Sequence, residues 1–327
     1  MRGLRWALGK IGAALLVVWI VATLVFFALR VSGDPLEAIL GGPGSQAGPE
    51  AVAAARAEYG LDQPLLVQYL VQLARIATLQ LGDSFARKQP VAALIGEQLA
   101  PTLLLATLAL ILAWLLAITG ATIAVHGRGP LGRAVSRVLR GIEVVATVTP
   151  QFWLGAVLIL LFVVGLGLLP ATSAGADPAG LVLPVVTLAV PIAGFLGQVM
   201  QAELDDADRA PFATTARSRG ASEAWVLWRH TLRHASIPAV ALSGWAYGSL
   251  LSGAVVVESL FARPGLGRLL LDAANARDVP LVIGAVVAVA VIYVSIVILS
   301  DLVELLLDPR LAEPRSSAPA AELTVGG

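Results

Sequence analysis

Six long apolar runs, separated by polar connections, dominate this chain of 327 residues. The runs cover residues 11–29, 101–125, 144–169, 181–202, 235–257 and 279–300. Each is near or above the roughly 20 residues that a helix needs to cross a bilayer. Backbone groups cannot stay unpaired in lipid, and the alternating pattern of a membrane barrel is absent. The runs therefore predict an all-α integral membrane protein with six transmembrane helices.

The first run resembles a signal peptide at its start, where Arg2, Arg5 and Lys10 precede apolar residues. It is longer than a typical signal-peptide core, and no small-residue cleavage site ends it. We therefore interpret residues 1–30 as the N-terminus and an uncleaved first transmembrane helix.

Composition agrees with a membrane protein and narrows the chemistry. Hydrophobic residues make up 57% of the chain and charged residues 13%, whereas soluble domains carry about 25% charged residues. The net charge is zero, which gives no electrostatic reason to expect a nucleic-acid partner. The absence of cysteine excludes disulfides and thiolate metal sites.

The distribution of Lys and Arg predicts the orientation. With the N-terminus inside, more basic residues fall in inner than in outer segments, and residues 171–180 contain none. Since short cytoplasmic loops are enriched in Lys and Arg, we expect both termini and the loop at 203–234 in the cytoplasm.

Residues 31–100 then form a periplasmic insertion after the first helix. The segment 41–49 is a flexible break, and helical spacing follows it, with apolar side chains at Leu66, Tyr69, Leu70 and Leu73. A glycine at position 60 and a proline at position 64 predict a break between two helices. A small helical cap and a loop packed on the membrane surface are both compatible with this pattern.

The inner loop contains the stretch TARSRGASEAWVLWRHTLRHASIP, residues 215–238. Pro211 suits the first turn of a short helix over 212–219, and Gly220 suits the position just past its end. Ser222 and Glu223 suit the start of a second helix that leads into the fifth span. On these grounds the loop is either a docking element for another protein or an interfacial helix anchored in lipid by its Trp and Arg side chains.

This stretch resembles the cytoplasmic signature loop of permease subunits from binding-protein-dependent ABC importers, in particular the peptide and nickel branch. Gly220 matches the glycine of the family's EAA motif, while Thr214, Thr215 and Ala216 occupy the EAA positions, so that the Glu is replaced. Further similar stretches, in matching order, are SGDPLEAIL, GLDQPLLVQYL, LGDSF, PTLLLA, TPQFWLG, ESLFARPGLGRLLLDAANARDVPLV and LLDPRL. The similarity covers about residues 4–311 and fits the subunit with a long periplasmic insertion.

The resemblance implies the type I ABC importer permease fold in a bacterial inner membrane. It implies a transmembrane core over 101–310, with the coupling loop at 203–234, and a cytoplasmic tail over 311–327. The implied partners are a second permease subunit, two ATPase subunits, an extracytoplasmic substrate-binding protein and the lipid bilayer. The implied ATPase-coupling residues are Phe212, Thr214, Thr215, Ala216, Arg217, Arg219 and Gly220.

The chain itself cannot bind ATP through a Walker A loop. Its two lysines, Lys10 and Lys88, lie outside any G-x-x-x-x-G-K-[ST] pattern. We therefore expect no catalytic residue and no cofactor here, with ATP bound by the partner subunits. We therefore expect a transport subunit and not an enzyme.

The segment FARPGLG separates the last two spans. In the similar family it lies at the periplasmic mouth, which implies that Phe261, Arg263, Pro264 and Gly265 contact the binding protein or its ligand. The alternative is a plain connector between two spans.

Other candidate chemistry is sparse. His230 and His234 are spaced for metal binding, but without a third ligand nearby they favour a polar helix face, so we predict no metal site. Asp301 and Glu304 lie at the inner end of the last span, where capping or pairing with a basic residue explains them better than proton relay. Prolines 150, 184 and 191 predict kinks.

Small residues concentrate in the fourth and fifth spans. They permit either a wide transport pathway or close helix packing, and the sequence leaves both open. They are Gly194, Gly197, Gly244, Gly248, Ser249, Ser252 and Gly253.

The resemblance favours a di- or oligopeptide as the substrate, with nickel or a metal–metallophore complex as the alternative. A stand-alone secondary transporter is a second alternative. It is disfavoured because the predicted spans lack ionisable groups near their centres.

Overall fold

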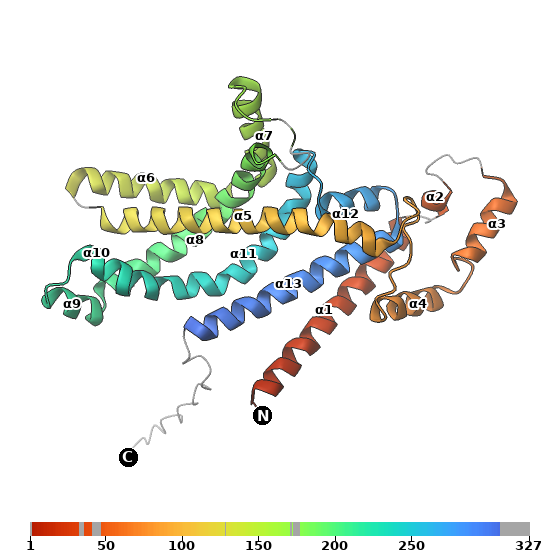
Figure 1. Ribbon diagram of the computed structural model, residues 1–327, viewed down its shortest axis with the longest axis horizontal. Helices are drawn as coiled ribbons and strands as arrows, with labels where there is room; N and C mark the ends of the chain where they lie inside the picture. Colours follow the sequence, from red (N-terminus) through yellow and green to blue (C-terminus); the bar gives the residue numbers. More distant parts are fainter. Residues whose placement is uncertain are drawn as a thin grey trace, which may run out of the picture.

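The computed structural model describes residues 2–32, 36–40, 47–127, 129–170, 172 and 177–307 (Figure 1). These residues form helices and connections, with one isolated β-bridge between Asp83 and Pro90. Five of the described helical stretches are long and apolar enough to cross a membrane, and the number is six if a bent pair of helices is counted as one span. The prediction of an all-α membrane protein is confirmed.

The five continuous spans are built from long helices. α1 covers Arg2–Ser32, α5 covers Val91–His126 and α8 covers Ala179–Arg209. α11 covers Leu232–Leu260 and α13 covers Val279–Leu307. α5 begins ten residues before the apolar run at 101, so Pro101 lies inside this helix and not at its start.

The third predicted span, 144–169, is wrong as a single helix. α6 covers Gly129–Val148, and a bend of 110° separates it from α7 (Gln151–Leu158) and its π-helical continuation η1 (Ile159–Gly165). Pro150 explains the break, since it lacks an N–H and disfavours a helical conformation in Thr149 before it. The kink expected at this proline is confirmed.

The search for apolar runs missed most of α6 because the first half of this helix carries basic side chains on one side. Arg133, Arg137 and Arg140 are exposed, whereas Ser136 and Glu143 are buried against the neighbouring helices. Residues 129–143 were expected in a cytoplasmic loop, yet they pack along α8 and α5 (Figure 1).

Glu143 is a buried carboxylate that the sequence did not identify. It lies between α5, α6 and α8, where the side chain of Gln201 donates a hydrogen bond to it. Glycines leave room for the Glu143 side chain. A Cβ at Gly120 would come within 2.9 Å of Glu143 Oε1, and a Cβ at Gly197 would come within 2.8 Å of it. A Cβ at Gly194 would lie 2.5 Å from the Glu143 carbonyl oxygen. The glycines of the fourth span therefore serve close helix packing.

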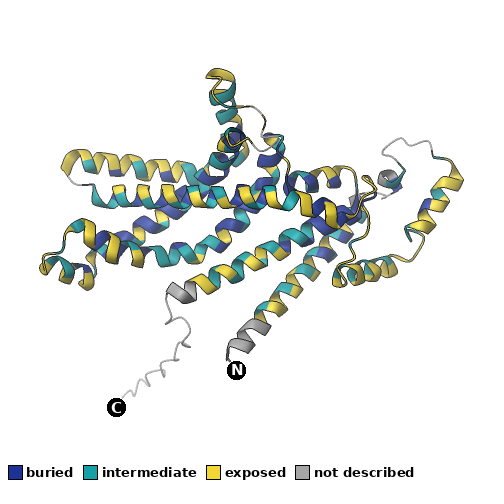
Figure 2. Ribbon diagram, viewed as in Figure 1, coloured by how far each residue is buried: buried dark blue, intermediate teal, exposed yellow. Residues whose placement is uncertain are grey.

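The core of the bundle lies where α5, α8 and α11 meet (Figure 2). α5 contributes alanines at helical spacing, which let backbones approach closely. These fully or almost fully buried alanines are Ala106, Ala109, Ala113, Ala117 and Ala121. Larger side chains, such as Leu196 and Met200 of α8, fill the spaces between them.

α1 and α13 pack together at the edge of the bundle, and Lys10 of α1 pairs with Asp301 of α13 at 2.5 Å. Pairing with a basic residue was expected for Asp301, while the side chain of Glu304 is outside the described residues.

The insertion carries α2 (Leu36–Ile39), α3 (Pro49–Glu58) and α4 (Leu65–Ala77). Gly60, with φ +64°, makes the expected break between α3 and α4. Most of the flexible break at 41–49 and the whole tail at 311–327 lie outside the described residues.

Asp278 attaches the insertion to the start of α13. Its carboxylate accepts hydrogen bonds from Ser84 Oγ at 2.5 Å and from the backbone N–H groups of Phe85 and Ala86, both at 3.1 Å. Two stretches noted in the sequence, LGDSF and ARDVPLV, thus meet in space. Both Asp278 and Ser84 are buried, so this contact fixes the N-terminal end of α13.

Candidate functional site

The loop after α8 folds as a helix, a glycine corner and a second helix, as the sequence predicts. α9 covers Pro211–Ser218, with the proline in its first turn. Gly220 adopts φ +85°, a conformation that glycine enters without steric cost. Ser222 then caps α10 (Glu223–Val226) by accepting a hydrogen bond from Trp225 N at 3.3 Å.

The second helix of the loop is continuous with the fifth span. α10 passes through a π-helical segment, η2 (Leu227–Thr231), into α11, and Pro238 lies inside α11. The second helix that the sequence predicted to lead into the fifth span thus joins it without a break. The consequence of this continuity is mechanical: a displacement of the corner passes directly along one helical run into the bundle.

Arg217 links the elements of the corner, by which we mean α9, Gly220 and α10. Its guanidinium donates to the side chain of Asp208, to the carbonyl of Asp208 at 2.9 Å and to Glu223 Oε2 at 3.2 Å. Burial acts to lower the pKa of Arg217, but the two carboxylates raise it and prevail, so its pKa lies above the ordinary value. The last turn of α8, α9 and α10 are therefore joined through one permanent cation.

Side chains of two further helices reach the acidic end of α8. His126, at the end of α5, lies 3.9 Å from Asp208 Oδ1. Arg140 of α6 pairs with Asp205 of α8 at 3.4 Å. Both contacts therefore reach the corner through the last turns of α8.

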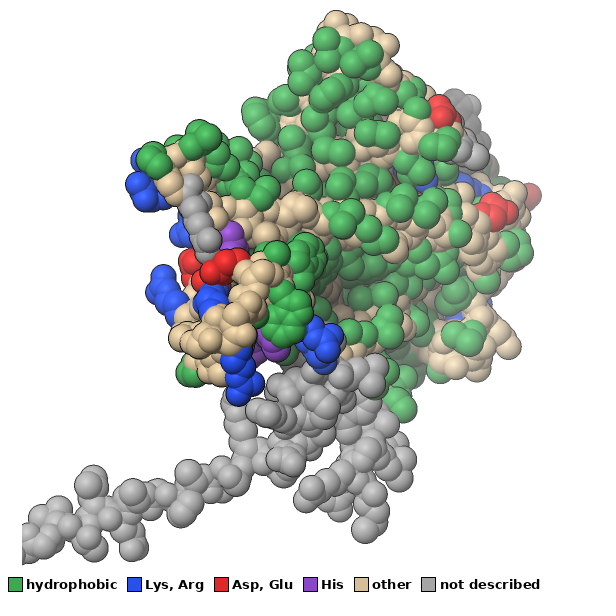
Figure 3. Space-filling view, turned by 60° about the vertical axis from the view of Figure 1, so that its left-hand side comes forward, with side chains coloured by type: hydrophobic (Ala, Val, Ile, Leu, Met, Phe, Trp, Pro, Cys, Tyr) green, Lys and Arg blue, Asp and Glu red, His purple; other side chains and the backbone are tan. Residues whose placement is uncertain are grey.

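A hollow of about 880 Å³ opens between α9 and the following helix. It is lined by Phe212, Thr215, Ala216, Arg219, Gly220, Ala221, Ser222, Trp225 and His230. Basic side chains gather at this end of the molecule, whereas most of the visible surface elsewhere is hydrophobic (Figure 3). The hollow thus combines exposed aromatic rings with positive charge.

An aromatic cluster forms one wall of the hollow. The Phe212 ring lies 5.7 Å from the His234 ring, and the Trp225 ring lies 4.9 Å from the His230 ring. The two histidines thus pack on aromatic rings, and the described residues hold no group of three metal-binding side chains. The sequence predicted a polar helix face here but not the aromatic contacts.

The structure sorts the predicted coupling residues into two groups. Phe212, Thr214, Thr215, Arg219 and Gly220 are exposed. Ala216 and Arg217 are only partly exposed, and Arg217 points to carboxylates of its own chain. Sequence reasoning missed the partners of Arg217, although the acidic end of α8, ELDDADR, offered a local signal for them.

The predicted mouth loop is organised by a buried glutamate that the sequence did not identify. Glu258 accepts hydrogen bonds from Thr102 Oγ1 at 2.5 Å and from Arg268 N at 3.0 Å. Thr102 Oγ1 in turn accepts one from Leu266 N at 2.7 Å. A Cβ at Gly265 would lie 2.1 Å from the Glu258 carboxyl carbon, so glycine is required for this close approach.

Of the predicted mouth residues, Phe261, Arg263 and Gly265 are buried, and Pro264 is exposed. Burial lowers the pKa of Arg263, against the opposing effect of the nearby Glu258. The exposed part of the loop borders a cavity of about 400 Å³ that includes Arg87 and Asp272, which lie 3.6 Å apart.

A second hollow, of about 600 Å³, lies between α11, α13 and the helix that precedes α13. Ser249 and Ser252 of α11, Trp245 and Tyr293 line it, with α12 (Leu266–Asn275) at one end. Gly248 also faces it, but a Cβ there would come within 2.4 Å of the Tyr293 ring. The serines of the fifth span therefore face open space, whereas Gly248 serves close packing.

The chain is similar in sequence to known transport proteins. Residues 117–313 match the family described as "Binding-protein-dependent transport system inner membrane component". The chain is 36% identical, over 93% of its length and 98% of the relative, to a proposed peptide transport system permease protein of Brucella suis biovar 1. It is 33% identical, over 94% of its length and 99% of the relative, to the glutathione transport system permease protein GsiC of Salmonella choleraesuis.

Proposed function

The chain belongs to the family of binding-protein-dependent transport system inner membrane components, and from this premise we propose that it is the permease subunit of an ATP-driven importer for di- or oligopeptides. Its fold is the type I importer permease fold of that family. The single observation that carries the mechanism is the exposed α9 corner, which the hydrogen bonds of Arg217 join to α8 and α10.

The corner is suited to receive force from a separate ATPase subunit. Phe212, Thr215 and Arg219 face outward around the hollow, while Ala213 is completely buried. A partner that inserts into the hollow would contact aromatic and cationic side chains and exclude water from them. Closure of two ATPases on ATP would then move the corner, and the continuous run from α10 into α11 would carry that movement into the bundle.

The hollow beside α11 supports the proposal that this chain forms half of the transport pathway. Ser249 and Ser252 offer hydroxyl groups, and Trp245 and Tyr293 offer apolar and polar ring edges. Together with a second permease subunit, this side would enclose a path that accepts varied side chains while it contacts the constant peptide backbone. An extracytoplasmic binding protein would deliver the substrate beside the exposed Pro264.

In the proposed orientation both termini and α9 are cytoplasmic and the insertion is periplasmic, as the basic residues predict. Single cysteines at Glu58 and Ser218 test this in the cysteine-free chain, since both side chains are exposed. An impermeant thiol reagent added to intact cells should label Glu58→Cys and spare Ser218→Cys until the membrane is opened. The opposite labelling pattern would reverse the orientation.

The substrate assignment rests on the chain's similarity to permeases named for peptide and glutathione transport. Cells that lack this gene should lose uptake of labelled di- and tripeptides and recover it with the intact gene, while uptake of nickel and chelated nickel stays unchanged. Loss of nickel or chelated-nickel uptake, with peptide uptake intact, would replace the peptide by the metal alternative and leave the permease assignment standing.

A further inference from the structure

α4 presents its apolar side outward. Leu66 and Leu70 are 67% and 55% exposed, and the exposed Ala74 and Ala77 continue the same stripe. Residues 63–74 contain no charged side chain. A helix on the surface of a water-soluble unit would turn these residues toward its core.

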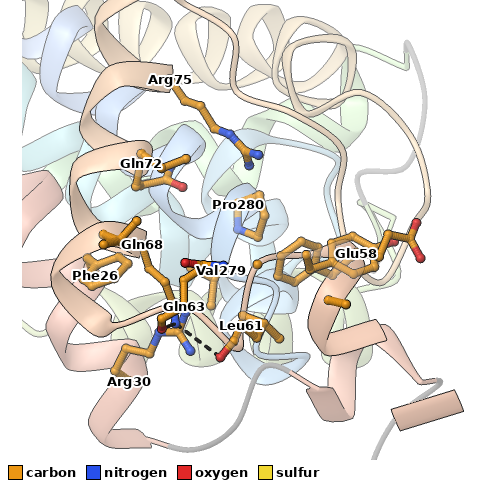
Figure 4. Close-up of a pocket in the computed structure, with 16 residues that line it drawn as sticks. Phe26, Arg30, Glu58, Leu61, Gln63, Gln68, Gln72, Arg75, Val279 and Pro280 are labelled. Atoms are coloured by element: carbon orange, nitrogen blue, oxygen red, sulfur yellow. Dashed lines mark hydrogen bonds between the residues drawn. The ribbon is translucent and has the colours of Figure 1, made fainter. Parts of the chain in front are cut away.

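The opposite side of α4 is polar and faces the protein. Gln68, Gln72 and Arg75, spaced by one helical turn, line a cavity of about 230 Å³ behind the helix (Figure 4). Gln68 accepts a hydrogen bond from Arg30 of α1 and donates to the carbonyl of Gln63 at 2.7 Å. α4 therefore places apolar side chains outward and polar side chains inward, as a helix does when its outer side lies in apolar surroundings.

Contacts with α1 place α4 beside the apolar part of a transmembrane helix. The Tyr69 hydroxyl lies 2.8 Å from Thr23 Oγ1 and accepts a hydrogen bond from Trp19 Nε1 at 3.0 Å. The apolar stretch of α1 ends at Val31, so Thr23 lies about 12 Å along the helix axis inside that stretch. Tyr69 thus reaches well below the level at which α1 leaves the membrane.

The neighbouring surface of α1 has the same character. Leu24, Phe27 and Val31 are exposed, and the Phe27 ring lies 5.6 Å from the Tyr69 ring of α4. Both helices carry exposed residues and contact each other near the end of the molecule that holds the insertion (Figure 2).

From these contacts we propose that α4 lies in the membrane leaflet that contains the C-terminal end of α1, with Leu66 and Leu70 among phospholipid acyl chains. In the orientation proposed above this is the outer leaflet. The partner of the stripe is lipid, and the polar side of α4 remains hydrated from the cavity behind it. The insertion is then a membrane-embedded brace for α1 and not a domain that projects freely into the periplasm.

A nitroxide spin label on Leu70→Cys tests the proposal directly, because the chain has no other cysteine. The full-length protein is reconstituted in phosphatidylethanolamine and phosphatidylglycerol vesicles, and collisions of the label with oxygen and with a water-soluble nickel chelate are compared. Leu24→Cys on α1 is the matched lipid-exposed control, and Glu58→Cys on α3 is the water-exposed control. We expect the ratio of oxygen to nickel collisions at Leu70 to match that at Leu24.

A ratio like that at Glu58 would show α4 in water and overturn the proposal. Low collision rates with both reagents would show that protein covers the stripe, and would overturn it equally. A fluorescent bimane on the same cysteine provides an independent reading. Phospholipids with brominated acyl chains should quench it and aqueous iodide should not, whereas the reverse result contradicts the lipid contact.

Discussion

Gly220→Trp is expected to reduce ATP-driven uptake by roughly tenfold or more while the protein still reaches the membrane. Gly220 has φ +85°, where a residue with a side chain loses about 1 kcal/mol or more. A Cβ at this position meets no atom of the chain within 4 Å, so the indole would point into the space proposed for the ATPase. The loss should therefore fall on coupling more than on folding. Uptake, ATPase stimulation and the membrane level of the protein are measured together.

Two control variants separate backbone strain from obstruction of the hollow. Gly220→Asn keeps a small residue that tolerates positive φ, and we expect it to retain most of the uptake. Gly167→Trp imposes the same change at φ +62°, also without neighbours within 4 Å, but beyond the end of η1 and away from the corner. Normal transport and ATPase stimulation in Gly220→Trp, or an equal loss in Gly167→Trp, would contradict the coupling role.

Local chemistry explains which parts of the corner the sequence could predict. Pro211 at a helix start, Gly220 past a helix end and Ser222 as a cap act within a few residues of themselves, so their positions in the chain predict their roles. The contacts of Arg217 were not predictable in the same way. Several carboxylates lie within its reach in the sequence, and only the folded geometry selects Asp208 and Glu223.

The membrane spans also show what can and cannot be predicted from local sequence. Charge-free runs predicted α8, α11 and α13 because every side of those helices is apolar along most of its length. α6 was missed because hydropathy averages over all sides of a helix and cannot see that Arg133 is exposed while Glu143 is buried. Glu258 and Thr102, which organise the mouth loop, are 156 positions apart in the chain. Local sequence patterns do not predict a contact between residues so far apart in the chain.

The dependence of transport on ATP tests the central claim most directly. The chain is combined with a second permease, two Walker A ATPase subunits and a binding protein in vesicles, and uptake of labelled di- and tripeptides is measured. We expect uptake only with ATP and all subunits, and none when the Walker A lysine of the ATPases is replaced. The reason is that neither lysine of this chain lies in a nucleotide-binding loop, so ATP would have to act through the partner ATPases, which we propose dock at the α9 corner. Uptake by this chain without ATPases, driven by an ion gradient, would contradict the account and establish the secondary transporter in its place.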